Sequence, residues 1–156
     1  MNGIREEGLR IGGETIRRAE TFPVHNPYTG QCIGTAAKAT VDDIDQAFQL
    51  AAHYVPTLTR HERGQILKRA AATMRQRTEE LSDLITAEAG LCKADTRYEV
   101  GRACDVFELA AHLALLDDGQ VFSCDISPLG KDRRIYTIRE PLTAISAITP
   151  FNHPLN

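Results

Sequence analysis

The chain has 156 residues, of which 42% are hydrophobic and 25% are charged, and its formal net charge is −3 at pH 7. This composition is typical of a globular protein and excludes a chain that is disordered throughout. Without a basic excess, neither a nucleic acid nor a membrane surface is expected as a partner. No apolar run reaches the roughly 18 residues that span a bilayer, and residues 1–7 lack the pattern of a secretion signal. We therefore expect a cytoplasmic protein, for which small-molecule chemistry remains open.

The first forty residues favour short strands separated by turns. Strands are predicted over 11–16, 21–24 and 32–36, with turns at Gly12-Gly13 and over 26–30. In the second turn a proline presets φ and a glycine supplies the positive φ that closes the turn. By itself this turn is a common loop.

The middle of the chain is predicted to form three helices. Thr40 is a candidate N-cap followed by two acids, and the first helix should run to about Val55, where a proline ends it. The second helix begins with a capping box from Thr59 to Glu62.

Thr78 is expected to cap a second segment of that helix, which ends at Gly90. A third helix is predicted from about 95 to 117. Its apolar stripe consists of Val100, Ala103, Cys104, Phe107, Ala110, Ala111 and Leu115.

The four cysteines lie far apart and form no C-x-x-C pair; they are Cys32, Cys92, Cys104 and Cys124. This spacing predicts no metal site and four reduced thiols. Cys104 should be buried, because it lies on the apolar side of a helix. No cysteine has neighbours that mark a nucleophile, so a nucleophile is expected outside these residues.

The last forty residues return to strand-like patterns. Residues 120–124 and 133–139 predict a two-stranded ribbon, which must dock on something to be stable. An apolar strand over 142–148 leads into a proline-bracketed polar turn that contains Asn152 and His153. Open α/β sheets bind ligands at the carboxyl ends of their strands, so both residues are expected at such an edge.

The order of several motifs resembles the amino-terminal third of aldehyde dehydrogenases, over roughly residues 20 to 156. The motifs are Asn26-Pro27-Tyr28-Thr29-Gly30, Glu88-Ala89-Gly90, Arg139-Glu140-Pro141 and Ile148-Thr149-Pro150-Phe151-Asn152. Within that superfamily, residues 87–92, 96–103, 117–120, 122–128 and 149–156 resemble phosphonoacetaldehyde dehydrogenases. Each motif alone is weak, whereas their order and spacing together are specific.

The resemblance implies an incomplete α/β fold, namely the amino-terminal part of the aldehyde dehydrogenase fold. Residues 1–119 would be strands and helices of a Rossmann-like NAD-binding domain. Residues 120–140 would be the β ribbon of an oligomerisation domain, with a homo-oligomer expected for the full-length protein. Residues 141–156 would be the first strand of a parallel sheet and an oxyanion turn, truncated there.

The implied reaction is the oxidation of an aldehyde to an acid with NAD, NADP not being excluded. A cysteine thiolate adds to the aldehyde, and the resulting oxyanion transfers a hydride to the nicotinamide, which leaves a thioester. A glutamate then activates water to hydrolyse the thioester. The substrate would be phosphonoacetaldehyde, with lactaldehyde or glyceraldehyde 3-phosphate as alternatives. In relatives the catalytic cysteine and glutamate lie downstream, so residues 1–156 alone are expected to be inactive. A non-catalytic module that associates with full-length subunits through its helices and ribbon is the other hypothesis.

Asn152 matches the oxyanion-hole asparagine of the family and is the candidate catalytic residue. The match also assigns Thr149, Pro150 and Phe151, together with Asn152, to the cofactor cleft, Phe151 standing where many relatives carry tryptophan. A plain turn cap before Pro154 is the alternative for Asn152.

Arg102 and His153 are candidate ligands for an anionic phosphonate, Arg102 through a bidentate fork and His153 as an imidazolium. An ion pair of Arg102 with Glu99 on the same helix, and a plain turn role for His153, remain alternatives.

Overall fold

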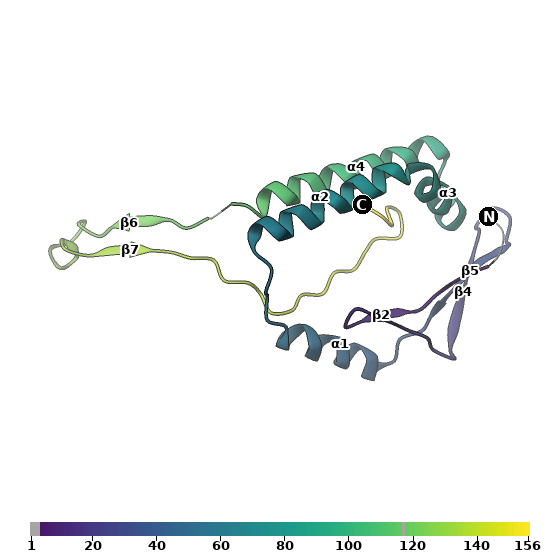
Figure 1. Ribbon diagram of the computed structural model, residues 1–156, viewed down its shortest axis with the longest axis horizontal. Helices are drawn as coiled ribbons and strands as arrows, with labels where there is room; N and C mark the ends of the chain where they lie inside the picture. The colour runs from purple at the N-terminus through teal and green to yellow at the C-terminus, as the bar shows by residue number, and fades with distance from the viewer. Residues whose placement is uncertain (1–3, 117) are drawn as a thin grey trace.

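The computed structural model describes residues 4–116 and 118–156. In this part of the chain five short strands come first, four helices follow, and a two-stranded ribbon comes last (Figure 1). The elements are β1 (Arg5–Glu7), β2 (Leu9–Ile11), β3 (Glu14–Ile16), β4 (Thr21–His25), β5 (Cys32–Ala37), α1 (Val41–His53), α2 (Arg60–Gln76), α3 (Thr78–Ala89), α4 (Lys93–Leu113), β6 (Val121–Ser123), the 3₁₀ turn η1 (Pro128–Gly130) and β7 (Arg134–Tyr136). This order of strands, helices and ribbon is the one predicted from the sequence.

Two small sheets form the amino-terminal head. β5 pairs in parallel with β1 and antiparallel with β4, while β2 and β3 form a hairpin. Gly12 and Gly13 have φ values of 60° and 87°, and a two-residue hairpin turn with positive φ at both positions strongly favours glycine. The run predicted as one strand over 11–16 is therefore two strands, because these glycines reverse the chain inside it.

α1 and α2 begin at the predicted caps. The Asp43 N–H donates to the Thr40 hydroxyl at 3.2 Å, and the Thr40 N–H donates back to Asp43 Oδ2 at 2.9 Å. Thr59 and Glu62 form the same reciprocal pair at the start of α2. α1 ends at His53, slightly before the predicted end. Both capping boxes are local in sequence, which is why the pattern was sufficient to find them.

An ion pair between a buried carboxylate and an exposed guanidinium ties the head of the molecule to α1. Asp43 is 3% exposed and binds Arg18, which lies between β3 and β4. The Arg18 guanidinium, aided by the Thr40 N–H, holds the pKa of the Asp43 carboxyl well below its usual range.

The second predicted helix is interrupted at Arg77, so the described residues contain four helices rather than three. Thr78 does not cap α3. Arg77 occupies the N-cap position without a side-chain hydrogen bond, and the Thr78 hydroxyl donates to the carbonyl of Arg75 at 2.7 Å. The last turn of α2 offers an open carbonyl directly behind Thr78, so the hydroxyl bonds backward instead of accepting an N–H ahead. Gly90 ends α3 as predicted, with φ of 73°.

α4 packs along α2 and against α3 and so forms the centre of the helical layer (Figure 1). Val100 and Cys104 of α4 form a buried apolar cluster with Ile85 of α3. The Ser82 and Thr96 hydroxyls share a buried hydrogen bond of 2.7 Å between the same two helices. The structure thus confirms that Cys104 is buried, and it contains all four cysteines as free thiols.

The carboxyl end of α4 differs from the prediction. The helix ends at Leu113 rather than near residue 117, and Leu115 is exposed although it continues the predicted stripe. Asp117, where the predicted helix ended, lies outside the described residues. None of the described helices is both long enough and apolar enough to cross a membrane.

β6 and β7 form the predicted antiparallel ribbon, with Phe122 opposite Ile135. The ribbon extends away from the helical layer (Figure 1). At its far end Ile126 and Leu129 are 95% and 85% exposed. An isolated two-stranded ribbon is marginal in water, so these apolar side chains are available to another surface.

The strand predicted over 142–148 is not formed in the described structure. This segment runs in an extended path from the ribbon back towards the helices (Figure 1). Leu142, Ile145 and Ile148 recur every three residues along it and remain exposed. A strand needs a ladder partner, and every described strand already belongs to β1–β5–β4, β2–β3 or β6–β7. The apolar pattern therefore predicted the extended backbone correctly, and the pairing of this segment in a parallel sheet stays a prediction.

Candidate active site

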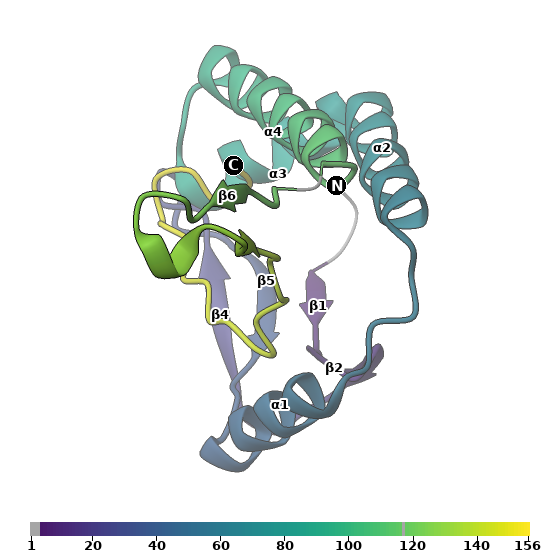
Figure 2. The same cartoon turned by 90° about the vertical axis from the view of Figure 1, so that its left-hand side faces the viewer.

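The returning segment leads into a turn over residues 151–154, beside the helical layer (Figures 1 and 2). Phe151, Asn152 and His153 are exposed in this turn, whereas Pro154 and Leu155 are half-buried. Leu155 packs against the apolar cluster of α3 and α4. The side-chain amide of Asn152 is therefore open to a small molecule while the chain immediately after it is anchored.

The anchor is the carboxylate of Glu99 on α4. Its Oε1 accepts the backbone N–H of Leu155 at 2.8 Å and that of Asn156 at 3.2 Å. Its Oε2 lies 3.8 Å from Nδ1 of His153. Glu99 is only 2% exposed, so a residue of the helical core holds the turn that carries Asn152 and His153.

Arg102 lies one helical turn beyond Glu99 and does not pair with it. Its guanidinium is placed over the ring of Tyr98, 5.9 Å from the ring centroid. Arg102 and Tyr98 are both exposed, whereas Glu99 points inward to the turn at 151–156. The alternative in which Arg102 serves a surface ion pair with Glu99 is therefore wrong in this structure. Arg102 remains available to an anion, and its role in binding substrate stays a prediction.

Glu88 at the end of α3 is an acid that the charge of Glu99 influences. It lines a shallow hollow together with Arg5, Val24, Gly34 and Leu84, between the head sheet and α3. Burial raises the pKa of the Glu88 carboxyl, with a smaller contribution from the negative charge of Glu99, while Arg5 opposes the shift.

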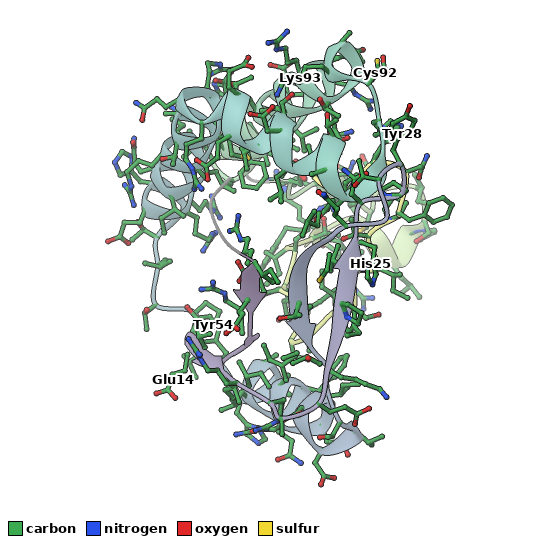
Figure 3. All side chains as sticks on the ribbon, turned by 90° about the vertical axis from the view of Figure 1, so that its right-hand side faces the viewer. Glu14, His25, Tyr28, Tyr54, Cys92 and Lys93 are labelled. Carbon is green, nitrogen blue, oxygen red and sulfur yellow. The ribbon has the colours of Figure 1, made fainter. Side chains whose placement is uncertain are left out.

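The turn over 26–30 contacts the end of α3. Asn26 Oδ1 accepts the N–H groups of Tyr28 and Thr29, each at 2.9 Å. A Cβ placed on Gly90 would lie 2.8 Å from Cγ of Pro27, so the turn and the helix end touch. Tyr28 projects on the side of the molecule that also carries Cys92 and Lys93 (Figure 3). Two segments that are far apart in sequence, and that carry much of the resemblance, thus form one contact.

The segment assigned to a cofactor cleft is open. Thr149, Pro150 and Phe151 are exposed, and Phe151 presents 92% of its surface. A flat aromatic face and neighbouring backbone fit one wall of a site for a planar ring. The roles of Thr149, Pro150 and Phe151 in cofactor binding, and that of Asn152 in the oxyanion hole, stay predictions.

The sequence interpretation missed Glu99 as a site residue because it considered Glu99 only as a local partner of Arg102. One signal was available, since Glu99 precedes Ala103 by four residues and so falls beside the apolar stripe of its helix. An acid on a buried helix face is unusual and points to a specific bonding partner.

The family model for aldehyde dehydrogenases matches residues 15–156. The chain belongs to the aldehyde dehydrogenase family. Its described strands, helices and ribbon correspond to the amino-terminal part of the aldehyde dehydrogenase fold.

Among curated aldehyde dehydrogenases, the chain is similar to 3-sulfolactaldehyde dehydrogenase of Priestia aryabhattai. The two are 31% identical over 157 aligned residues, which cover 100% of this chain and 33% of that enzyme. The chain thus spans about a third of the length of this relative.

Three solved aldehyde dehydrogenases share the architecture. Aldehyde dehydrogenase 21 from Physcomitrella patens, in complex with its reaction product succinate, has a TM-score of 0.80 and 26% identity, over 85% of this chain and 28% of that one. An NAD-dependent aldehyde dehydrogenase from Sinorhizobium meliloti has a TM-score of 0.73 and 25% identity, over 88% and 28%. A lactaldehyde dehydrogenase has a TM-score of 0.72 and 25% identity, over 80% and 27%.

Proposed function

We propose that residues 1–156 supply the amino-terminal part of an NAD(P)-dependent aldehyde dehydrogenase that oxidises an anionic aldehyde to its acid. The observation that carries the proposal is the family match, which runs from residue 15 through the turn that contains Asn152. The anchored, open geometry of that turn supports the same role, because it presents an amide donor at a defined position.

Asn152 would act when a cysteine thiolate of the remaining protein adds to the aldehyde. The carbonyl oxygen then becomes an oxyanion, and the side-chain N–H of Asn152 donates a hydrogen bond to it. Removal of one such donor from comparable sites lowers kcat by about 100- to 1,000-fold.

The exposed face of Phe151, with Thr149 and Pro150 before it, would form one wall of the dinucleotide site. The dinucleotide, when bound, supplies the hydride acceptor of the reaction. What these three residues do is place an apolar surface beside Asn152 and exclude water from that side. The residues that would distinguish NAD from NADP lie outside residues 1–156, so the proposal includes both.

Phosphonoacetaldehyde is the substrate that we propose, and its anionic phosphonate is the feature that the site is expected to recognise. Arg102 is exposed and outside any pairing with Glu99, and His153 shares the turn with Asn152, so both could bind an anion. Two of the similar enzymes also handle anionic compounds by name, a sulfonate aldehyde in one case and succinate in the other. The lactaldehyde dehydrogenase favours a neutral hydroxyaldehyde as the competing substrate.

A second function, an association module, is favoured by the exposed apolar side chains of the ribbon. Ile126 and Leu129 near its far end, with Tyr136 on β7, offer apolar surface that a second subunit would cover. In the full-length protein this surface would support a homo-oligomer. Where the reading frame continues past the Asn156 codon into a cysteine and a glutamate motif, the enzyme is favoured; where it stops, the module is favoured.

The test measures dinucleotide reduction by the full-length protein, with residues 1–156 as a second sample. Phosphonoacetaldehyde, 3-sulfolactaldehyde and lactaldehyde are compared with NAD and with NADP. We expect turnover by the full-length protein, with the highest kcat/KM for phosphonoacetaldehyde, and none by residues 1–156. Turnover by residues 1–156 would refute the claim that the catalytic cysteine and glutamate lie outside them. A kcat/KM for lactaldehyde that equals or exceeds that for phosphonoacetaldehyde would refute the preference for an anionic substrate.

A further inference from the structure

The carboxylate of Glu99 is in an unusual setting for an acid on a helix. It is 2% exposed and lies in α4 beside the buried cluster of Val100 and Cys104. Burying a carboxylate is costly unless hydrogen bonds replace its water. The replacement comes from residues 56 and 57 positions later, whose N–H groups both donate to Oε1.

The contacts of Glu99 with the turn all fall on residues that follow Asn152. Leu155 and Asn156 are fixed through their backbone, and His153 is approached through Oε2 at 3.8 Å. The backbone that carries the Asn152 side chain is therefore fixed by hydrogen bonds that begin three residues later, at Leu155.

The second carboxylate oxygen of Glu99 is buried as well. Oε2 of Glu99 and Oδ1 of Asn156 are both buried, and neither has a hydrogen-bond partner within residues 4–116 and 118–156. The second oxygen faces the side of the turn where His153 lies.

We propose that Glu99 is the positioning residue of the oxyanion turn, holding the backbone at Leu155 and Asn156 so that the Asn152 amide, three residues earlier, points at the reacting carbonyl oxygen. The proposal rests on the proposed function, in which Asn152 donates to the oxyanion. Its basis in chemistry is that a donor must be held in place before the reaction, since a misplacement of about 1 Å can cost about 100-fold in rate.

Three substitutions separate the roles of this side chain. Glu99→Gln keeps an oxygen acceptor for the two N–H groups and replaces the second carboxylate oxygen with an NH₂ group. Glu99→Ala removes both groups. Glu99→Met removes the acceptor but fills the volume, so it replaces the alanine variant if that protein does not fold. Glu108→Ala is the matched control, because Glu108 is on the same helix and, among the described residues, its carboxylate bonds Arg75 at 2.7 Å.

The first readout is amide hydrogen exchange at Leu155 and Asn156, measured on the 156-residue chain. We expect exchange at both amides to accelerate by about tenfold or more in Glu99→Ala and Glu99→Met, the factor for one lost bond to a charged acceptor. Glu99→Gln should keep most of the protection, and Glu108→Ala all of it. Unchanged exchange in both Glu99→Ala and Glu99→Met would overturn the anchoring.

The second readout is kcat of the full-length protein per folded active site, with KM measured alongside. We expect Glu99→Ala or Glu99→Met to lower kcat more than it changes KM, and Glu99→Gln to recover most of kcat. In the double variant with Asn152→Ala, loss of Glu99 should cost little more, because both residues act through one donor. Fully additive losses would overturn the positioning role and leave Glu99 as a stabilising residue.

The two proposals fail separately. If Asn152→Ala leaves kcat unchanged, the proposed function is wrong. If Asn152→Ala lowers kcat while Glu99→Ala and Glu99→Met do not, the proposed function stands and the positioning role is wrong.

Discussion

The contact between Gly90 and Pro27 can be tested with an internally matched pair of glycines. Gly90 has φ of 73°, and a Cβ added there would lie 2.8 Å from Cγ of Pro27. Gly30 has nearly the same φ, 71°, and a Cβ there would meet nothing within 4 Å. Alanine at Gly30 therefore tests the backbone conformation alone, whereas alanine at Gly90 tests the conformation and the contact together.

The expected magnitudes follow from these two facts. A non-glycine residue in the left-handed region costs about 1–2 kcal/mol, so Gly30→Ala should lower the free energy of unfolding by that amount. Overpacking a closed contact costs about 1–3 kcal/mol more, so Gly90→Ala should lower it by about 2–5 kcal/mol in total. Removing the ring should relieve the contact, so the double variant Pro27→Ala, Gly90→Ala should recover most of the excess over Gly30→Ala.

The assay is equilibrium urea unfolding of the 156-residue chain, with Pro27→Ala as a further control. The reasoning is refuted if Gly90→Ala and Gly30→Ala cost the same, because the turn over 26–30 would then not touch the end of α3. It is equally refuted if Pro27→Ala fails to relieve Gly90→Ala.

Two further predictions concern charge. The pKa of Asp43 is lowered on folding, so its contribution to stability is full above the unfolded pKa of about 3.9 and is lost as pH falls towards the folded pKa. Asp43→Asn should therefore weaken the decrease of the unfolding free energy at acid pH. If that decrease is unchanged, the ion pair with Arg18 does not contribute as stated. In the full-length protein Arg102→Gln should raise KM for an anionic aldehyde by about 10- to 100-fold while leaving KM for a neutral aldehyde nearly unchanged, and an equal effect on both substrates would exclude Arg102 as the anion ligand.

The parts of the fold that the sequence predicted are those encoded within a few residues. Interactions between residues less than about 20 positions apart determine the capping boxes at Thr40 and Thr59, the left-handed conformation of Gly90 and the ribbon. Thr78 shows the limit even of local patterns, since its hydroxyl had two possible partners and bonds the carbonyl of Arg75.

The parts that could not be predicted depend on distant segments. The apolar run over 142–148 indicates an extended backbone, but whether it becomes a strand depends on a partner that no pattern within the run specifies. Glu99 is the clearest case at the candidate site, because its partners lie 56 and 57 residues away while its sequence neighbour Arg102 suggested a local ion pair.

The assignment of the chemistry depends most directly on Asn152. The decisive measurement is kcat of the full-length protein with Asn152→Ala, under saturating aldehyde and dinucleotide. The account predicts that kcat falls by about 100- to 1,000-fold while the protein stays folded, because the oxyanion loses one pre-positioned donor. A folded variant that retains the wild-type kcat would contradict it.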